Sequence, residues 1–400
     1  MARSSASSSA RPGSSGAAAI SRVYLDYAGF SPVDPRVLAV MRPFLEGGVG
    51  NPSSSHALGL EARASLDGAR AKVARLFGGV PSGVIFTATA TEANNLAIRG
   101  LAGRASGRHL VVSAVEHISV LNACRELERQ DWAVTRVGVD GEGRVDPGAV
   151  AGAIRRDTAL VSVMAANCEI GTLQPVREIG RVTRAAGVPF HVDAVGALGR
   201  VPLGVDECGV DLLTLSSNDL YGPPGAAALW VRRDIHLAPL TLGGGQERGY
   251  RSGTENLPAI VGMGVAADFM RVEGAGEVAR LGRLRDRLVE GLISRIPESR
   301  VTGPEGAGRL PHHASLVLPG ARADVVLTDL DARGVSASSG SACASLTGQP
   351  SHVLRAIGFD DELAETSLCF TLGRWTAMPE IDALIEVLPA VVARRRRLAP

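Results

Sequence analysis

Short apolar runs alternate with longer amphipathic stretches from Val23 onward. The runs are rich in β-branched residues and are bounded by turn residues, a pattern typical of buried strands, whereas the stretches between them have helical spacing. The runs occur at 84–88 (VIFTA), 109–115 (HLVVSAV), 159–166 (ALVSVMAA), 189–195 (PFHVDAV) and 211–217 (DLLTLSS). This alternation predicts an α/β fold with a mostly parallel sheet, helices on both faces and ligands at the carboxyl ends of the strands.

The pattern changes after a long helical stretch at about 255–296. Two further strand signals, at 314–320 and 368–373, precede a final helix from about Pro379. We therefore expect a large domain at 22–270, whose first part contributes to the other domain, and a smaller α/β domain at 271–400. Residues 1–21 contain no acidic residue and are dominated by Ser, Ala and Gly, which predicts a disordered tail.

Composition excludes several classes of function. A net charge of +1 and 4% aromatic residues give no basic, aromatic-rich face for nucleic acid. No apolar run reaches the roughly 18 residues of a membrane span. The five cysteines are an odd number and widely scattered, which argues against a disulfide framework and predicts a cytoplasmic protein.

One feature of the composition limits the chemistry. Among 42 basic residues Lys72 is the only lysine. It falls on the polar face of an amphipathic helical stretch, where a solvated surface charge is expected. Any reaction that needs a lysine amine therefore has a single candidate.

Nine motifs follow one another with spacing that resembles one enzyme family. They are VYLDYAGFSPVDP (23–35), GNPSSSH (50–56), TATATEANN (87–95), EHISV (116–120), NCEIGTLQP (167–175), HVDAVGA (191–197), SSNDLYGPPGAAALWV (216–231), GGGQERGYRSGTEN (243–256) and SASSGSACASLTGQPSHVLRAIG (336–358). Together, over about residues 23–388, they resemble the cysteine desulfurases, fold-type I enzymes of the class V aminotransferase family that use pyridoxal phosphate. The resemblance implies a large domain with a mostly parallel seven-stranded sheet flanked by helices, and a homodimer.

The resemblance also implies residue roles around the cofactor ring. Asp193 matches the carboxylate that pairs with the pyridine nitrogen, so that the ring can act as an electron sink. His117 matches the imidazole that stacks on the ring and serves in acid/base chemistry. Asn167 matches the side chain that contacts the phenolic oxygen of the cofactor.

Further matches concern the phosphate and the sulfur. Thr91, at a predicted helix start, and Ser216 match phosphate contacts, and Thr254 matches a contact that reaches in from the partner subunit. Cys343 matches the nucleophile that carries a persulfide, and its Gly/Ser-rich loop suits transfer of sulfur to a partner protein.

The departures from the family pattern lie at the reacting centre. Asp219 stands in place of the Schiff-base lysine, and Asn218 in place of the histidine before it, where it could still contact a cofactor. The remaining departures are Gly196 for a glutamine, Cys369 for the arginine that holds a substrate carboxylate, Thr89 for a glycine and Cys168 for an asparagine. An aspartate cannot form an imine, although a desolvated carboxylate can act as a base.

Three hypotheses follow. The first is a repurposed enzyme of a specialised biosynthetic pathway, which acts on a small molecule without a covalent lysine link, through acid/base or nucleophilic chemistry of Asp219 and His117. A variant of this hypothesis keeps pyridoxal or pyridoxamine phosphate bound non-covalently. The second is a non-catalytic dimer partner, or a sulfur acceptor that uses Cys343. The third is a weak cysteine desulfurase with non-covalent pyridoxal phosphate.

Overall fold

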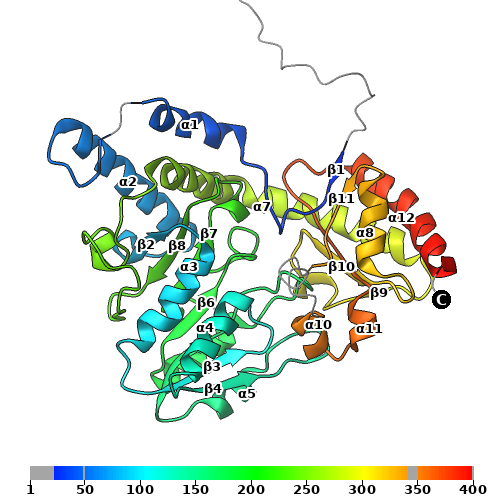
Figure 1. Cartoon of the computed structure of the whole chain (residues 1–400), viewed down its shortest axis with the longest axis horizontal. Coiled ribbons are helices and arrows are strands. Elements are labelled where there is room, and N and C mark those ends of the chain that lie inside the picture. Colours follow the sequence, from blue (N-terminus) through cyan, green and yellow to red (C-terminus); the bar gives the residue numbers. More distant parts are fainter. Residues whose placement is uncertain (1–21, 48–49, 341–349, 399–400) are drawn as a thin grey trace, which may run out of the picture.

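The structure is a computed structural model that describes residues 22–47, 50–340 and 350–398. Its main feature is a seven-stranded sheet in the order β2-β8-β7-β6-β5-β3-β4, in which only β8 runs antiparallel to its neighbours (Figure 1). These strands are β2 (Val84–Thr87), β3 (His109–Ser113), β4 (Ala133–Val137), β5 (Thr158–Ser162), β6 (Phe190–Asp193), β7 (Leu212–Ser216) and β8 (Ala227–Val231). The predicted α/β class with a mostly parallel seven-stranded sheet flanked by helices is confirmed.

Both faces of this sheet are buried. Neighbouring residues of each strand point to opposite faces, so each strand contributes side chains to two hydrophobic cores. Val111 and Leu213 face one hydrophobic core, whereas Leu110 and Leu212 face another. The helices around the sheet are α1 (Pro35–Leu45), α2 (Ala57–Leu76), α3 (Ala90–Asn95), α4 (Ile118–Glu128), α5 (Pro147–Ala153) and α6 (Val176–Ala186). The first core includes α2 and α6, and the second includes α3 and α4.

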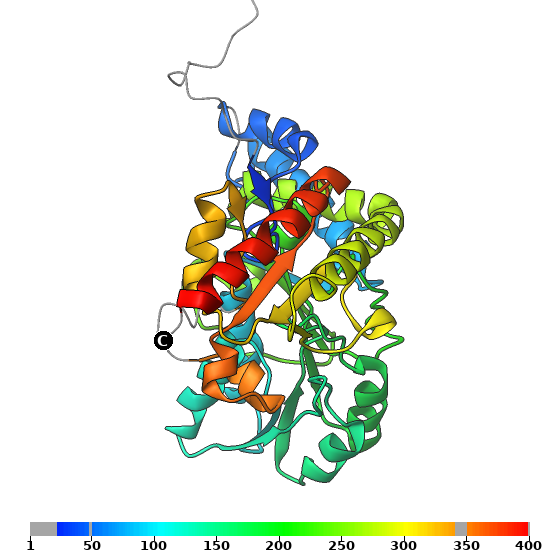
Figure 2. The ribbon, with the colours of Figure 1, turned by 90° about the vertical axis from the view of Figure 1, so that its right-hand side faces the viewer.

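A three-stranded antiparallel sheet, in the order β12-β10-β9, forms the centre of a third core. Its strands are β9 (Arg300–Val301), β10 (His313–Val317) and β12 (Ser367–Thr371), and the nearby helices are α8 (Ala323–Asp331), α10 (His352–Ala356), α11 (Asp361–Ala364) and α12 (Met378–Leu398). Figures 1 and 2 show α8 and α12 against this sheet. Strand β1 (Val23–Tyr24) belongs to the same region, because it pairs in parallel with β11 (Val335–Ser336).

One long helix connects the cores. In α7 (Leu257–Ile293), Asn256 caps the N-terminus and Pro258 stands in the first turn, where its missing N–H costs no helical hydrogen bond. Residues 257–270 of α7 pack in the first core, and residues 281–292 pack in the third. The domain boundary that the sequence places near residue 270 falls inside this helix, so that division stays a prediction.

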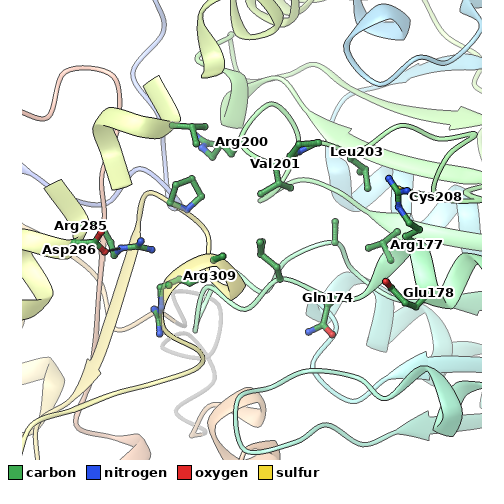
Figure 3. Close-up of a pocket in the computed structure, with 18 residues that line it drawn as sticks. Gln174, Arg177, Glu178, Arg200, Val201, Leu203, Cys208, Arg285, Asp286 and Arg309 are labelled. Carbon is green, nitrogen blue, oxygen red and sulfur yellow. Dashed lines mark hydrogen bonds and ion pairs between the residues drawn. The ribbon is translucent and has the colours of Figure 1, made fainter. Parts of the chain in front are cut away.

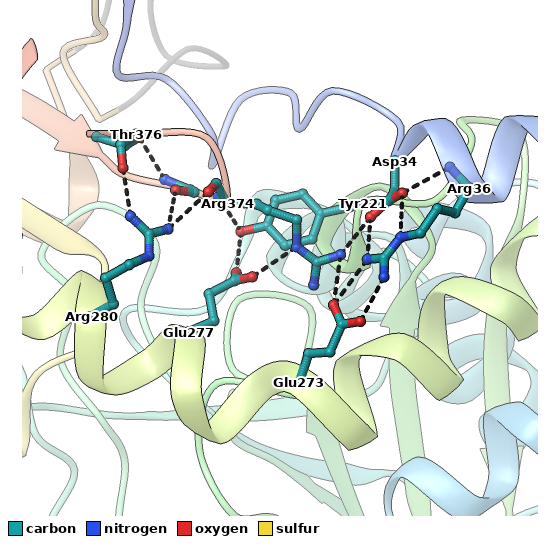
Figure 4. A network of polar contacts seen from close by, with 9 residues as sticks. Asp34, Arg36, Tyr221, Glu273, Glu277, Arg280, Arg374 and Thr376 are labelled. Atoms are coloured by element: carbon teal, nitrogen blue, oxygen red, sulfur yellow. Dashed lines mark hydrogen bonds and ion pairs between the residues drawn. The ribbon is translucent and has the colours of Figure 1, made fainter.

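A polar network links α1, α7 and the segment after β12 (Figure 4). The Arg374 guanidinium donates to Asp34 at 2.6 Å and to Glu277 at 2.8 Å. The Tyr221 hydroxyl donates to Glu277 at 2.5 Å and accepts from the backbone N–H of Arg374 at 3.0 Å. Tyr221 has a φ of 61°, a left-handed conformation that is uncommon for residues other than glycine. The hydrogen bonds of its hydroxyl to Glu277 and Arg374 hold it in place.

The sequence predicts most of these elements but not β4. Its Thr135 and Arg136 lie on an edge strand that is largely half-buried, so the strand lacks a continuous apolar run. In the part of the chain that the structure describes, helices are too short or too polar to cross a membrane.

Candidate functional site

A cavity of about 250 Å³ lies at the carboxyl ends of β6 and β7 and beside the first turns of α3 and α4. Asp193 ends β6, and Asp219 lies in the single 3-10 turn that follows β7. Thr91, His117 and Asn218 also line the cavity. The strand-end positions therefore bring five of the predicted site residues together.

The Asp193 carboxylate is held on two sides. Asn94 donates to it at 2.7 Å, and the backbone N–H of Val195 donates at 3.1 Å. The Asn94 amide nitrogen also donates to the Ser119 hydroxyl at 2.9 Å. Asp193 is thus fixed in orientation at the cavity wall.

His117 has a defined hydrogen-bonding pattern because it caps α4. Its Nδ1 accepts the backbone N–H of Ser119 at 3.1 Å and lies 2.7 Å from the Ser119 hydroxyl, which accepts from Asn94. A neutral ring whose Nδ1 accepts must carry its proton on Nε2. His117 therefore offers a ligand an N–H donor rather than a free ring acceptor.

Asp219 is buried, and burial raises the pKa of its carboxyl to about 6. The nearby Arg200 and a hydrogen bond from Ser216 favour the charged form, whereas Asp193 opposes it. Asp219 is consequently ionised at neutral pH but can gain a proton within about one pH unit of it. Such a group suits proton transfer near neutrality.

The other predicted contacts are arranged differently. The Asn218 side chain accepts the backbone N–H of Ser31 at 3.3 Å. Asn167 donates to the Val115 carbonyl, accepts from the backbone N–H groups of Glu169 and Ile170, and does not line this cavity. Ser216 hydrogen bonds to Asp219, and Thr254 is exposed in the segment before α7; neither residue lines the cavity of the single chain. Cys343 lies outside the described residues.

A second cavity of about 220 Å³ adjoins the first, since His117, Met164 and Cys168 line both. Cys369 lines the second cavity and is buried on β12, with its sulfur 3.1 Å from His313 Nε2. Burial raises the pKa of the Cys168 thiol to about 12 and that of Cys369 well above its usual value. Both thiols are therefore neutral and poorly nucleophilic in this state.

His312 and His313 line the first cavity but are missed by the sequence analysis. Arg309 lies 3.4 Å from His313 Nδ1 and can only donate, so Nδ1 accepts and Nε2–H points to the Cys168 carbonyl at 2.9 Å. Burial lowers the pKa of His313 to about 3 and that of His312 well below its usual value. The only available signal was the unusual pair of adjacent histidines before a strand.

The lining of the two cavities has an uneven charge. Its described residues include five carboxyl groups and four imidazoles but no arginine or lysine: Asp26, Glu116, Glu169, Asp193 and Asp219, with His117, His312, His313 and His352. Burial raises the pKa of Glu169 to about 7 and that of Glu116 well above its usual value, so part of this set is protonated. The carboxylates that stay ionised favour binding of a cation over an anion beside them.

Two further positions bear on what fits in the cavity. An added Cβ at Gly196 would meet nothing closer than the Ala166 carbonyl at 3.8 Å, so the small residue leaves open space. Lys72 lies on α2 and is absent from the described lining of both cavities. It is half-buried rather than fully solvated, which corrects the expectation from the sequence.

The amino-acid sequence of this chain is similar to those of known proteins over most of its length. The family model described as "Aminotransferase class-V" matches residues 23–384. A protein named cysteine desulfurase IscS 1 from Archaeoglobus fulgidus is 45% identical over 94% of this chain and 98% of its own. A cysteine desulfurase IscS from Dictyoglomus turgidum is 41% identical over 94% and 96%.

Solved structures agree with the sequence relatives. A structure described as a NifS-like protein superposes with a TM-score of 0.87 at 32% identity and covers 93% of this chain and 100% of its own. The DndA structure from Streptomyces lividans gives a TM-score of 0.73 at 33% identity over 87% and 99%. The chain therefore belongs to the class-V aminotransferase family, among its cysteine desulfurase-like members.

Proposed function

We propose that this protein is a repurposed enzyme of the family, which acts on a small molecule in the former cofactor cavity without a covalent lysine link. The observation that carries the proposal is the buried carboxylate of Asp219 in the cavity, at the position where the motif resemblance expects the Schiff-base lysine, with the single lysine elsewhere on α2. Because an aspartate cannot form an imine, covalent cofactor attachment at this position is excluded chemically.

In the proposed mechanism Asp219 is the base, and His117 is a hydrogen-bond donor to the ligand. The Asp219 carboxylate, with a pKa of about 6, takes a proton from the ligand. His117 donates a hydrogen bond to the ligand through Nε2–H, because its Nδ1 accepts from the backbone N–H of Ser119. The positive charge of the nearby Arg200 stabilises the ionised form of Asp219.

The cavity fits a vitamin B6 cofactor that is bound without a covalent bond. Asp193, fixed by Asn94 and Val195, would face the ring nitrogen, and the start of α3 at Thr91 would face the phosphate. When bound, the protonated ring supplies an electron sink. Pyridoxamine phosphate suits the cavity better than the aldehyde form, since its ammonium would lie near the Asp219 carboxylate.

The charge of the lining also restricts the substrate. With Cys369 in place of the expected arginine, the described walls offer no cation to a carboxylate. We therefore propose a neutral or amine-bearing substrate. The relatives named cysteine desulfurase suggest cysteine instead, but that substrate would leave its carboxylate beside buried acidic groups.

The decisive experiment compares the natural chain with Asp219→Lys. Each protein is incubated with pyridoxal phosphate, treated with borohydride, dialysed exhaustively and analysed by intact mass and peptide mapping. In the natural chain we expect bound cofactor that borohydride does not fix covalently to the protein. In the variant we expect a covalent adduct at position 219. A covalent adduct at Lys72 of the natural chain, with loss of the bound chromophore in Lys72→Arg, would overturn the proposal.

We further propose that the enzyme works as a cytoplasmic homodimer. Exposed leucines on α1 and the start of α2, Leu38, Leu45, Leu58 and Leu60, support a contact surface, and Thr254 on its exposed segment is free to reach a neighbouring cavity. Sedimentation equilibrium tests this part, and the paired change Leu45→Glu and Leu60→Glu should shift the protein toward the monomer.

A further inference from the structure

A separate cleft of about 720 Å³ lies between the large sheet and the third core (Figure 3). One wall comes from the start of α6 and from residues 200–203, and the other comes from α7 and residues 306–311. Apolar side chains such as Val201, Leu203 and Val278 form much of the surface between them. The cleft is large enough for a small organic molecule.

Arg200 is the unusual residue of this cleft. It is only 4% exposed, and its Nε is buried without a hydrogen-bond partner among the described residues. Its guanidinium carbon lies 5.8 Å from the centre of the Tyr221 ring, which offers only a weak cation–π contact. A buried guanidinium that lacks a full set of partners is costly unless an anion meets it.

Two more buried arginines stand on the opposite wall. Arg285 donates to Asp286 at 2.6 Å and to the Leu310 carbonyl at 3.2 Å, and Asp286 is itself 56% exposed. Arg309 donates to the Pro304 carbonyl at 2.7 Å and to the Ser315 hydroxyl at 3.3 Å. These partners of Arg309 are uncharged, so the wall carries a positive charge that its own hydrogen bonds do not neutralise.

The other charged groups at the cleft offset this charge only in part. Arg177 and Glu178 lie at the outer edge on α6, and Arg177 pairs with Glu207. Burial, and in second place the nearby Arg285, lower the pKa of the Arg309 guanidinium to about 10, so repulsion between the two arginines contributes to the cost of this wall. An anion between the two walls would relieve it.

We propose that this cleft is a second ligand site, which takes a small carboxylate or phosphate with an apolar body between Arg200 and Arg285. The anionic group would lie against the two guanidiniums, and the apolar body would lie on Val201, Leu203 and Val278. The site is distinct from the cavity of Asp219. The two are close neighbours, since Pro311 lines the cleft and His312 lines the cavity.

The test is isothermal titration calorimetry of the full chain with benzoate and, separately, with inorganic phosphate. We expect saturable binding of at least one anion, weakened roughly tenfold or more by Arg200→Gln and by Arg285→Gln. Asp286→Asn should tighten binding, because it removes the competing carboxylate. Arg283→Gln, an exposed position on the same helix, is the matched control and should change nothing.

Each outcome bears on the site. Binding of phosphate alone, or of benzoate alone, supports the site and identifies the class of anion. Absence of saturable heat for both, or binding that is insensitive to Arg285→Gln and Asp286→Asn, overturns the proposal. Should Arg200→Gln fail to fold, Asp286→Asn on α7 still decides the matter, since the Asp286 side chain is 56% exposed.

Discussion

Asn94 donates a hydrogen bond of 2.7 Å to Asp193, although 99 positions separate the two residues along the chain. The same amide reaches Ser119, whose hydroxyl lies against His117. The carboxylate and the imidazole of the cavity are therefore oriented by one asparagine on α3.

Replacing this asparagine should have a measurable cost. We expect Asn94→Ala to lower the free energy of unfolding by about 1–3 kcal/mol, because the buried Asp193 carboxylate loses a donor. Asn95→Ala is the matched control, since the Asn95 side chain donates only to the exposed Thr91 carbonyl. Urea denaturation measures both variants, and equal losses would contradict the role given to Asn94.

The raised pKa of Asp219 predicts a pH-dependent stability. A folded pKa of about 6 exceeds the ordinary value of 3.8, so the folded state holds this proton more tightly and stability falls as the pH rises from about 4 to 6. We expect Asp219→Asn to raise the free energy of unfolding by roughly 2–3 kcal/mol at pH 7.5.

The gain should fade near pH 4, where Asp219 is protonated in the natural chain as well. Glu116 and Glu169 also titrate, but they are the same in both proteins and cancel in the difference. Denaturation curves at a series of pH values give the comparison. A variant that is less stable than the natural chain at pH 7.5 would mean that Arg200 and Ser216 outweigh the cost of burying the Asp219 carboxylate, which contradicts its raised pKa.

The same carboxylate predicts which form of the cofactor binds. At pH 7.5 pyridoxamine phosphate should bind more tightly than pyridoxal phosphate, because its ammonium meets the ionised Asp219. The preference should decrease below pH 6 and should be lost in Asp219→Asn. Equilibrium dialysis of both compounds tests this, and a preference for the aldehyde that survives the substitution would argue against the assignment.

The network of Figure 4 predicts unequal costs for two arginines that share Asp34. Arg374 is 13% exposed and Arg36 is 48% exposed. Arg374→Met should cost about 3 kcal/mol, because it removes the ion-pair partner of the buried Glu277 and one of the two guanidiniums at Asp34. Arg36→Met should cost about 1 kcal/mol or less. Thermal unfolding of the two variants provides the measurement, and similar losses would mean that the network is solvated.

Sequence patterns predict the parts of the site that follow apolar strands. Asp193 and Asp219 come directly after the runs that form β6 and β7, and parallel strands bring their carboxyl ends to one edge. The strand positions in the sheet are confirmed for the same reason, since buried parallel strands have continuous apolar runs.

Other site residues depend on contacts that no local pattern encodes. Asn94 lies within a helix, and its two partners come from β6 and α4. His313 reaches the cavity because β10 pairs with β12, which places His313 opposite Thr371. Arg200 is one of many arginines, and what distinguishes it is its burial together with an Nε that lacks a hydrogen-bond partner among the described residues. Such residues become visible when the tertiary structure is known.

The helix α7 has a consequence for how the molecule unfolds. At 37 residues it is about 55 Å long, and its two halves contribute apolar side chains to different cores. Melting either half would remove one wall from its core and fray the start of the other half. The two cores are thus expected to share one cooperative transition, and a chain cut within α7 would leave two fragments with bare apolar surfaces and a strong tendency to aggregate.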